Sequence, residues 1–336
     1  MLIERNKLLA PLTTFRIGGR AKFFVEAKSI DDVRDAVQFA KKNDLRIFIL
    51  GGGSNVLISD KGFDGLVIKI SMKGLKFSDT EDSVILSTGA GEIWDDVVGK
   101  AVRRNLGGIE NLSLIPGTAG AALYQNIGAY GVELKDSFEN ANVLDIKSGK
   151  IKMLLKKDCE LGYRDSVFQH KEGKKYVILS VRLRLSKEPK PNIYYPDLIK
   201  YFENKKLSIA EVRKAVIKIR RAKLVYPDEL GTAGSFFKNP TVPISSFKVL
   251  ISEYPDIRGR DLGNGLVKLS AAQLIEKAGW KGHRSGNVGV SDKHALVLVS
   301  YNRGKAVEIV QLSDKISKDI KTKFRVALEP EVRIIG

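Results

Sequence analysis

The chain has 336 residues, 43% of them hydrophobic, which is typical of a globular protein with two or three domains and excludes a disordered or fibrous class. The first residues lack the basic start and apolar core of a signal peptide, and no apolar run approaches membrane-spanning length. The single cysteine, Cys159, cannot form an internal disulfide. We therefore expect a cytoplasmic protein that has no membrane partner.

The net charge of +18 raises the question of a nucleic-acid partner, because attraction to phosphates dominates such binding. The 57 Lys and Arg residues are spread over nearly every segment, with no basic tail, zinc-knuckle spacing or aromatic RNA-binding motif. We predict no nucleic-acid partner, although an anionic small ligand could use a few of these charges locally. The histidines, His170, His283 and His294, are far apart and have no neighbours at metal-ligand spacing, so no metal site is predicted.

The first predicted elements are a strand, a helix and a second strand. Residues 21–27 have the composition of a strand, and Ser29 with Asp32 can cap the helix that follows. The predicted apolar face of this helix consists of Ile30, Val33, Val37 and Ala40. Residues 46–50 are predicted to form a short buried strand.

A glycine-rich loop follows that strand directly, at residues 51–55 (GGGSN). Residues without side chains let backbone N–H groups approach an anion closely. The spacing is neither G-x-G-x-x-G nor that of a P-loop. A dinucleotide phosphate site and a plain tight turn both remain open.

Two further strands are predicted at residues 66–70 and 84–87, and a helix at residues 93–102. Residues 107–120 and 125–131 then combine glycine with small and amide residues. Such segments are poor material for a core, and they suit a backbone laid against a flat or phosphorylated ligand.

The remainder begins with a charged, proline-broken connector at residues 186–191, which suits a domain boundary. Ser208 and Glu211 form a capping box for a helix that is predicted to extend through Arg221. Later predicted elements are a helix at 270–278, a strand at 295–299 and a basic amphipathic helix at 304–324.

Residues 233–240 bring a hydroxyl, a cation and an amide together in Ser235, Lys238 and Asn239. Gly234 allows a left-handed turn and Pro240 stops any regular element, which is typical of a site loop. The alternative from the residues alone is a turn in which Ser235 only caps a helix.

Six motifs in order carry a resemblance that covers essentially the whole chain. They are residues 49–55 (ILGGGSN), 115–120 (IPGTAG), 125–131 (QNIGAYG), 162–166 (GYRDS), 234–240 (GSFFKNP) and 328–333 (LEPEVR). The set closely resembles the UDP-N-acetylenolpyruvoylglucosamine reductase family of bacterial peptidoglycan synthesis.

The resemblance implies a mixed α/β fold. It consists of an FAD-binding domain of the vanillyl-alcohol-oxidase (PCMH) type in two subdomains, followed by a C-terminal α/β substrate-binding domain. The expected bounds are 1–67 and 68–205 for the two FAD-binding subdomains, 206–325 for the substrate-binding domain, and 326–336 for a strand that returns Glu331 to the active site.

The implied activity is the NADPH-dependent reduction of UDP-N-acetylglucosamine enolpyruvate to UDP-N-acetylmuramate. FAD is the bound cofactor and NADPH the co-substrate, with hydride passing from flavin N5 to the vinyl carbon. We expect a monomer whose partner is a UDP-sugar. An FAD-linked oxidase of a hydroxylated small molecule is the alternative, and a non-enzymatic nucleic-acid binder also stays open.

Three residues match the catalytic positions of the family. Arg164 can stabilise the charge that spreads onto the substrate carboxylate, because a guanidinium donates two parallel hydrogen bonds; without the family it reads as a surface salt bridge to Asp165. Ser235 matches the proton donor, since the carbon formed after hydride addition is basic enough to take a proton from a hydroxyl. Glu331 matches the second catalytic position, and Glu329 is expected to be structural.

The other expected contacts also come from the resemblance. The cofactor contacts are Gly51, Gly52, Gly53, Ser54, Asn55, Gly117, Thr118, Gly120, Gln125, Asn126, Gly128, Arg164 and Arg220. The substrate contacts are Tyr163, Tyr195, Lys223, Asn239 and His294. Tyr194 could serve instead of Tyr195, and complementarity to the helix dipole is an alternative role for Arg220 and Lys223. The chain departs from the family pattern at Leu123-Tyr124 and at His294, where relatives have glutamine.

Overall fold

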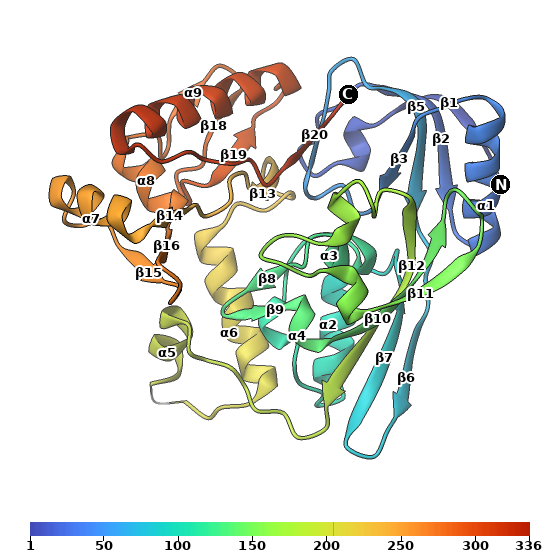
Figure 1. Cartoon of the computed structure of the whole chain (residues 1–336), viewed down its shortest axis with the longest axis horizontal. Coiled ribbons are helices and arrows are strands. Elements are labelled where there is room, and N and C mark those ends of the chain that lie inside the picture. The colour runs from blue at the N-terminus through green and yellow to red at the C-terminus, as the bar shows by residue number, and fades with distance from the viewer. Residues whose placement is uncertain (204) are drawn as a thin grey trace. The chain divides into compact units, whose positions relative to one another are not determined.

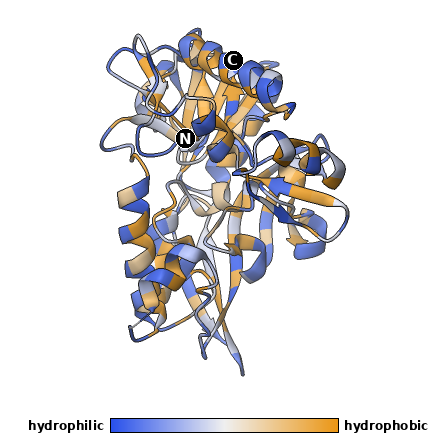
Figure 2. Cartoon of the chain, turned by 90° about the vertical axis from the view of Figure 1, so that its left-hand side faces the viewer, coloured by the Kyte–Doolittle hydropathy of each residue, from blue (hydrophilic) through white to orange (hydrophobic). Residues whose placement is uncertain are grey.

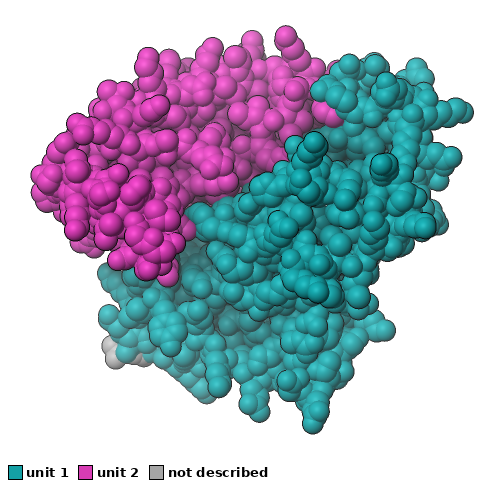
Figure 3. All heavy atoms as spheres, in the orientation of Figure 1, with its two compact units in different colours: residues 1–7, 21–52, 64–221 teal, residues 8–20, 53–63, 222–336 magenta. Residues whose placement is uncertain are grey.

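The computed structural model describes residues 1–203 and 205–336 and divides into two compact units (Figure 3). Unit 1 consists of Met1–Lys7, Ala21–Gly52 and Asp64–Arg221, and unit 2 of Leu8–Arg20, Gly53–Phe63 and Ala222–Gly336. Each unit therefore joins segments that are distant in the sequence. The expected domain bounds at residues 67, 205 and 325 stay a prediction.

The first sheet lies almost entirely in unit 1 and has the strand order β1-β2-β5-β3 (Figure 1). Its strands are β1 (Glu4–Leu8), β2 (Arg20–Ala27), β3 (Ile47–Leu50) and β5 (Phe63–Ile70). Helix α1 (Ile30–Lys42) connects β2 to β3 and begins with the predicted capping box between Ser29 and Asp32. Val33, Val37 and Ala40 are buried as predicted, but Ile30 is 37% exposed because it is the first residue of the helix and lies at the edge of its apolar face.

The second sheet of unit 1 is antiparallel, with the order β11-β10-β12-β7-β6. Its strands are β6 (Leu75–Asp79), β7 (Ser83–Gly89), β10 (Phe138–Asp145), β11 (Ile151–Leu155) and β12 (Tyr176–Ser186). The associated helices are α2 (Trp94–Arg103), α3 (Ala119–Tyr124) and α4 (Leu134–Ser137). Helices α3 and α4 pack against β12, and Trp94 of α2 is buried with its indole donating to the carbonyl of Leu112 at 2.9 Å.

A short hairpin and two helices complete unit 1. The hairpin pairs β8 (Gly128–Ala129) with β9 (Val132–Glu133). The helices are α5 (Pro196–Phe202) and α6 (Ile209–Lys223), and the last two residues of α6 belong to unit 2. Leu198 of α5 packs with Val212 and Val216 of α6 in a small apolar cluster. Ser208 bonds the amide of Glu211 at 3.3 Å, which confirms the predicted start of α6.

Unit 2 contains three small sheets. Their orders are β13-β19-β18-β17, β14-β16-β15 and β20-β4. The strands are β4 (Val56–Ile58), β13 (Gly231–Ser235), β14 (Thr241–Pro243), β15 (Gly259–Asp261), β16 (Leu266–Leu269), β17 (Arg284–Ser285), β18 (Val288–Val290), β19 (Val297–Ser300) and β20 (Arg333–Ile335). The helices are α7 (Ile244–Glu253), α8 (Ala271–Lys277) and α9 (Ala306–Phe324). Helix α9 packs on β18 and α8, and Ile309, Ile316 and Ile320 face the core.

The hydropathy of the residues agrees with their places in these sheets and helices. Hydrophobic residues concentrate in the strands and hydrophilic residues on the outer turns of the helices (Figure 2). In the part of the chain that the structure describes, no helix has both the length and the apolar character needed to cross a membrane. The predicted mixture of helices and strands is confirmed.

Candidate active site

In unit 1, the glycines that follow β3 lie against the loop that precedes α3. A Cβ added to Gly52 would come to 2.7 Å from the Cα of Gly117, and one added to Gly51 would come to 2.9 Å from the Oγ1 of Thr118. A Cβ cannot approach a backbone atom that closely, so Gly52 is required by packing. The sequence could not distinguish a turn from a phosphate loop here, and the structure adds that two glycine-rich loops form one backbone surface.

Backbone hydrogen bonds hold the second of these loops in place. The amides of Ala119 and Gly120 donate to the carbonyls of Glu92 and Ala90, each at 2.9 Å, and the amide of Trp94 donates to the carbonyl of Gly117 at 3.0 Å. The hydroxyl oxygen of Thr118 is buried and has no hydrogen-bond partner among the described residues. A buried hydroxyl without a partner is costly unless a ligand satisfies it. This surface therefore fits a cofactor that offers polar groups.

Asp95 was not identified from the sequence, yet it fixes the start of this loop. Its Oδ1 accepts from the Leu114 amide at 2.5 Å, and its carboxylate pairs with Arg213 of α6 at 2.6 and 2.9 Å. Burial by itself would raise the pKa of Asp95, but hydrogen bonds from Arg213 and Leu114 outweigh it and lower the pKa. The only signal in the sequence was an acidic residue in the first turn of a helix.

The loop at residues 125–131 continues the surface. Gln125 is half-buried, whereas Asn126 is fully buried in the left-handed conformation, with φ 43°. The side chain of Asn126 donates to the carbonyl of Gly162 at 2.6 Å and accepts from the amide of Lys135 at 2.9 Å. These bonds connect the loop to the segment that carries Arg164.

Arg164 is half-buried and also has a left-handed backbone, with φ 54°. The Nη2 of Arg164 donates to the carbonyl of Gly128 at 2.5 Å. The backbone carbonyl of Arg164 accepts from the side chain of Gln169 at 3.0 Å. The alternative partner from the sequence, Asp165, bonds His170 at 2.8 Å and the amide of Ser166 at 2.9 Å. The structure therefore brings Arg164 to the predicted cofactor loop.

Two predicted substrate-contacting tyrosines also lie in unit 1. Tyr163 is 37% exposed, and the guanidinium of Arg164 lies 5.7 Å from its ring centroid. Tyr195 precedes α5, and its ring packs edge-on against Tyr130 of the glycine-rich loop at 5.2 Å. The neighbouring Tyr194 is 87% exposed, so these contacts favour Tyr195.

In unit 2, Ser235 and Glu331 lie on neighbouring segments. Ser235 ends β13, and both Phe236 and Phe237 behind it are buried. The amide of Glu331 donates to the carbonyl of Phe236 at 2.7 Å, and the amide of Lys238 donates to the carbonyl of Glu329 at 2.9 Å. Ser235 is thus the end of a paired strand and not a helix cap, and both Ser235 and Glu331 are half-buried.

Asn55, which also belongs to unit 2, bonds the segment that carries Glu331. Its side chain donates to the carbonyl of Glu331 at 3.0 Å, and its carbonyl accepts from the amide of Arg333 at 3.1 Å. Strands β4 and β20 then continue in parallel, with Val56 opposite Arg333. The predicted cofactor residue Asn55 therefore positions the segment that carries Glu331.

Asn239 and His294 are two further predicted residues of unit 2. Asn239 accepts from the amide of Ala271 at 3.0 Å, at the start of α8. The Nδ1 of His294 accepts from the amide of Leu296 at 3.2 Å. Burial, followed by the charges of Lys281 and Lys223, lowers the pKa of His294.

The structure divides the predicted site residues between the two units. Unit 1 contains Gly51, Gly52, Gly117, Thr118, Gly120, Gln125, Asn126, Gly128, Tyr163, Arg164, Tyr195 and Arg220. Unit 2 contains Gly53, Ser54, Asn55, Lys223, Ser235, Asn239, His294 and Glu331. Within unit 1, the structure brings Arg164 together with Asn126 and Gly128. Within unit 2, it brings the segments of Ser235 and Glu331 together.

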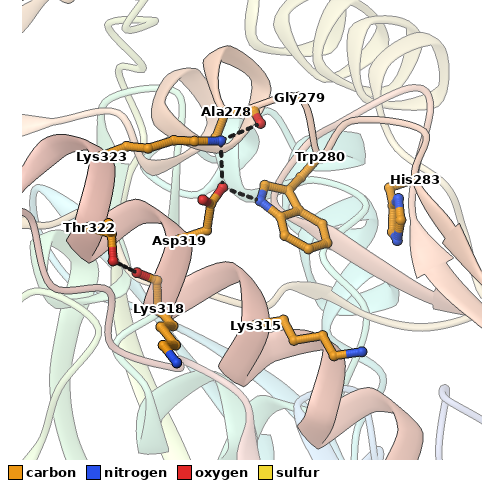
Figure 4. Close-up of a pocket in the computed structure, with 9 residues that line it drawn as sticks. All are labelled: Ala278, Gly279, Trp280, His283, Lys315, Lys318, Asp319, Thr322 and Lys323. Atoms are coloured by element: carbon orange, nitrogen blue, oxygen red, sulfur yellow. Dashed lines mark hydrogen bonds and ion pairs between the residues drawn. The ribbon is translucent and has the colours of Figure 1, made fainter.

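A separate surface hollow of about 570 Å³ in unit 2 contains none of these residues (Figure 4). Trp280 forms part of its wall, and the indole donates to Asp319, which also pairs with Lys323 (Figure 4). Over the described ranges, no group of three or more His, Cys, Asp or Glu residues is arranged to hold a metal ion.

Comparison with known proteins finds separate matches for the N-terminal and C-terminal parts of the chain. A family model described as FAD binding domain matches residues 21–154, and one described as UDP-N-acetylenolpyruvoylglucosamine reductase, C-terminal domain, matches residues 226–335. Taken with the glycine surface and the Thr118 hydroxyl, the first match makes FAD the cofactor of this chain and makes it a flavin oxidoreductase.

Relatives cover the whole chain. The UDP-N-acetylenolpyruvoylglucosamine reductase of Pseudomonas aeruginosa is 41% identical over 333 residues, which are 98% of each chain. That of Amoebophilus asiaticus is 40% identical over 339 residues, covering 100% of both. The crystal structure of the Thermus caldophilus enzyme superposes over 100% of both chains with a TM-score of 0.71 and 24% identity, which confirms the predicted fold. The chain belongs to the UDP-N-acetylenolpyruvoylglucosamine reductase family.

Proposed function

We propose that the chain reduces UDP-N-acetylglucosamine enolpyruvate to UDP-N-acetylmuramate, with NADPH as the reductant, as a step of peptidoglycan precursor synthesis. The observation that supports this proposal is the backbone hydrogen bond from Glu331 to Phe236, which pairs the segment carrying Glu331 with the residue that follows Ser235. Family membership supports the substrate, and Ser235 and Glu331 are proposed to carry out the proton transfer that its reduction requires.

The glycine surface would hold FAD. Gly52 and Gly117 pack against each other and have no side chains to cover their backbone groups, which could therefore face a flat or phosphorylated group, and the Thr118 hydroxyl would bond it. When bound, FAD transfers hydride from NADPH to the vinyl carbon of the substrate. Gly51, Gly53, Ser54, Asn55, Gly120, Gln125, Gly128 and Arg220 are proposed as further FAD contacts. Asn126 would contact FAD through its backbone alone, because its side-chain hydrogen bonds are all made within the protein.

Arg164 would stabilise negative charge on the substrate. Hydride addition to the vinyl carbon leaves charge spread over the adjacent carbon and its carboxylate. A guanidinium that already donates one hydrogen bond to the Gly128 carbonyl would donate to that carboxylate with little reorganisation. This interaction strengthens as the charge develops, so it accelerates the step.

Ser235 would protonate the adjacent carbon. A hydroxyl is a weak acid, so it serves as the donor only if it is held at the right face of a strongly basic carbon. The strand pairing of β13 supplies a fixed position, and Glu331 would polarise the carboxylate region of the substrate. Lys223 would bind the diphosphate, and Tyr163, Tyr195, Asn239 and His294 would contact the rest of the UDP-sugar.

Anaerobic flavin spectroscopy tests the proposal. The purified protein should be yellow; NADPH should bleach the flavin, and the enolpyruvyl substrate should restore its colour. UDP-N-acetylglucosamine is the matched control, because it lacks only the enolpyruvyl group and should leave the flavin reduced. A protein that consumes oxygen with a hydroxylated substrate and no NADPH would instead be an oxidase, and a colourless protein that FAD cannot reconstitute would contradict the proposal.

A further inference from the structure

The side chain of Asn126 makes all its hydrogen bonds inside the protein. Its Nδ2 donates to the Gly162 carbonyl at 2.6 Å and to Oε2 of Glu133 at 3.1 Å, and its Oδ1 accepts from the Lys135 amide at 2.9 Å. The chemistry of the partners fixes the orientation of the amide, because the Lys135 N–H can only donate and the Gly162 carbonyl can only accept. Asn126 is fully buried, so this arrangement has one geometry.

A second hydrogen bond joins the same two loops, with its donor on the loop that carries Arg164. Gly162 precedes Arg164 by two residues, and the Nη2 of Arg164 donates to the carbonyl of Gly128, which follows Asn126 by two. The two loops are therefore joined twice, once through the side chain of each. Such a reciprocal connection limits sliding of one loop past the other.

The backbone of Arg164 needs this support. A left-handed conformation is unfavourable for a residue with a long side chain and persists only where the surroundings enforce it. Gly162 is held by Asn126, and the Arg164 carbonyl is held by Gln169 at 3.0 Å. The conformation of Arg164 is thus fixed from both sides along the chain.

Gly128 lets the guanidinium of Arg164 approach the backbone of the other loop closely. A Cβ added to Gly128 would be 3.1 Å from the Nη1 of Arg164, closer than an ordinary contact. The position of the guanidinium therefore depends on the loop that Asn126 anchors.

We propose that Asn126 is a positioning residue for Arg164, holding the 162–165 turn so that the guanidinium meets the substrate carboxylate. This proposal rests on the role of Arg164 in the proposed function. Asn126 itself touches neither the substrate nor the reacting atoms through its side chain. Its loss would therefore slow oxidation of the reduced flavin by substrate and leave reduction by NADPH nearly unchanged.

The test compares Asn126→Gly with Asn105→Gly. Glycine tolerates the left-handed backbone at both positions, and Asn105 has φ 55° on an exposed turn. For flavin-loaded Asn126→Gly, we expect the substrate half-reaction to slow about 10- to 100-fold and the NADPH half-reaction to change less than about 3-fold. Asn105→Gly should match the wild type in both half-reactions.

A double-variant cycle separates positioning from a general structural role. In an Arg164→Lys background the guanidinium is already absent, so adding Asn126→Gly should cost less than about 3-fold more in the substrate half-reaction. Losses that multiply in the double variant, or equal slowing of both half-reactions by Asn126→Gly, would overturn the proposal.

A second variant covers the case in which Asn126→Gly does not fold. Asn126→Asp keeps the shape and can still accept from the Lys135 amide, but it cannot donate to Gly162. Wild-type substrate rates in flavin-loaded Asn126→Asp would also overturn the proposal. Failure of the proposed function is distinct, because the wild type would then fail the substrate half-reaction itself; a normal rate in Arg164→Lys would remove the role of Arg164 and the inference with it.

Discussion

The backbone amide of Glu331 donates to the carbonyl of Phe236 at 2.7 Å, so Glu331 lies beside the residue that directly follows Ser235. The other glutamate of the motif, Glu329, instead extends to Lys238, with Oε1 2.7 Å from Nζ, and its side chain is 71% exposed. The two glutamates therefore differ in environment although they are two residues apart.

This difference predicts opposite outcomes for two matched variants. Glu331→Gln should slow oxidation of the reduced flavin by substrate about 100-fold, because the carboxylate that we propose to polarise the substrate becomes neutral. Glu329→Gln should change that rate less than about 2-fold, since exposed ion pairs contribute little. Stopped-flow absorbance of the flavin measures both, and equal losses would refute the choice of Glu331.

Ser235→Ala should separate the two half-reactions. Without its proton donor, the substrate half-reaction should slow by about 100- to 10,000-fold, whereas reduction by NADPH should stay close to the wild-type rate. Ser246→Ala, an exposed position in α7, provides the control for serine substitution in the same unit. Equal slowing of both halves in Ser235→Ala would indicate that this hydroxyl only stabilises the fold.

Thr118→Val should affect stability and cofactor affinity in opposite directions. Removing a buried hydroxyl that has no partner among the described residues should stabilise the flavin-free protein by about 1 kcal/mol. The lost bond to FAD should weaken flavin binding about 10-fold. Denaturant unfolding of the apoprotein and a flavin fluorescence titration measure the two effects.

Thr13→Val provides the contrast for Thr118→Val. Thr13 is also buried, but its hydroxyl bonds the carbonyls of Ala10 and Ile17 at 3.1 and 3.0 Å. Valine at this position should therefore destabilise the apoprotein. If Thr118→Val destabilises it as well, the Thr118 hydroxyl has a partner within the folded protein and the argument for FAD there is lost.

His294 should act as a neutral group. Its pKa is lowered from the ordinary value of 6.5 by burial and by Lys281 and Lys223, so it is uncharged at neutral pH. His294→Gln, which keeps a hydrogen-bonding side chain that cannot become charged, should change the KM for the UDP-sugar less than about 3-fold between pH 6.5 and 8. A KM that tracks protonation of His294 near pH 6.5 would contradict this.

The lowered pKa of His294 also predicts how the stability of the protein depends on pH. The folded-state pKa lies below the unfolded value, so the contribution of His294 is present above pH 6.5 and is lost as the pH falls below it. The wild type should therefore lose more stability than His294→Gln between pH 6.5 and 5. Denaturant unfolding of both proteins across that range provides the measurement.

Local sequence signals predicted the elements with clear caps or periodicity. The capping box at Ser29, the strand before Gly51 and the long helix α9 all follow from residues close in sequence, and all are confirmed. Strands β10 and β12 were not predicted. Asn140 and Asn142 interrupt the apolar pattern of β10, whereas residues 181–185 of β12 alternate between apolar and charged as a half-buried strand does, so that signal was present. What no local pattern indicates is the pairing of β10 with β12, which joins residues that are distant in the sequence.

The candidate site shows the same limit. Family motifs identified Arg164, Ser235 and Glu331, but not the contacts that hold them, since these join residues as distant as Asn55 and Glu331 or Asn126 and Gly162. The sequence does not distinguish a buried asparagine from an exposed one in a polar loop. Its partners became visible only in three dimensions.

The parallel pairing of β4 with β20 has a consequence for synthesis on the ribosome. Val56 and Ile58 emerge early, but their partners in the two-stranded sheet, Arg333 and Ile335, are made after almost all the rest of unit 2. Because a nascent chain folds only what has emerged, β4 must wait, with its edge unpaired, until that strand arrives. Completion of unit 2 and pairing of the Glu331 backbone with that of Phe236 are therefore late events in folding.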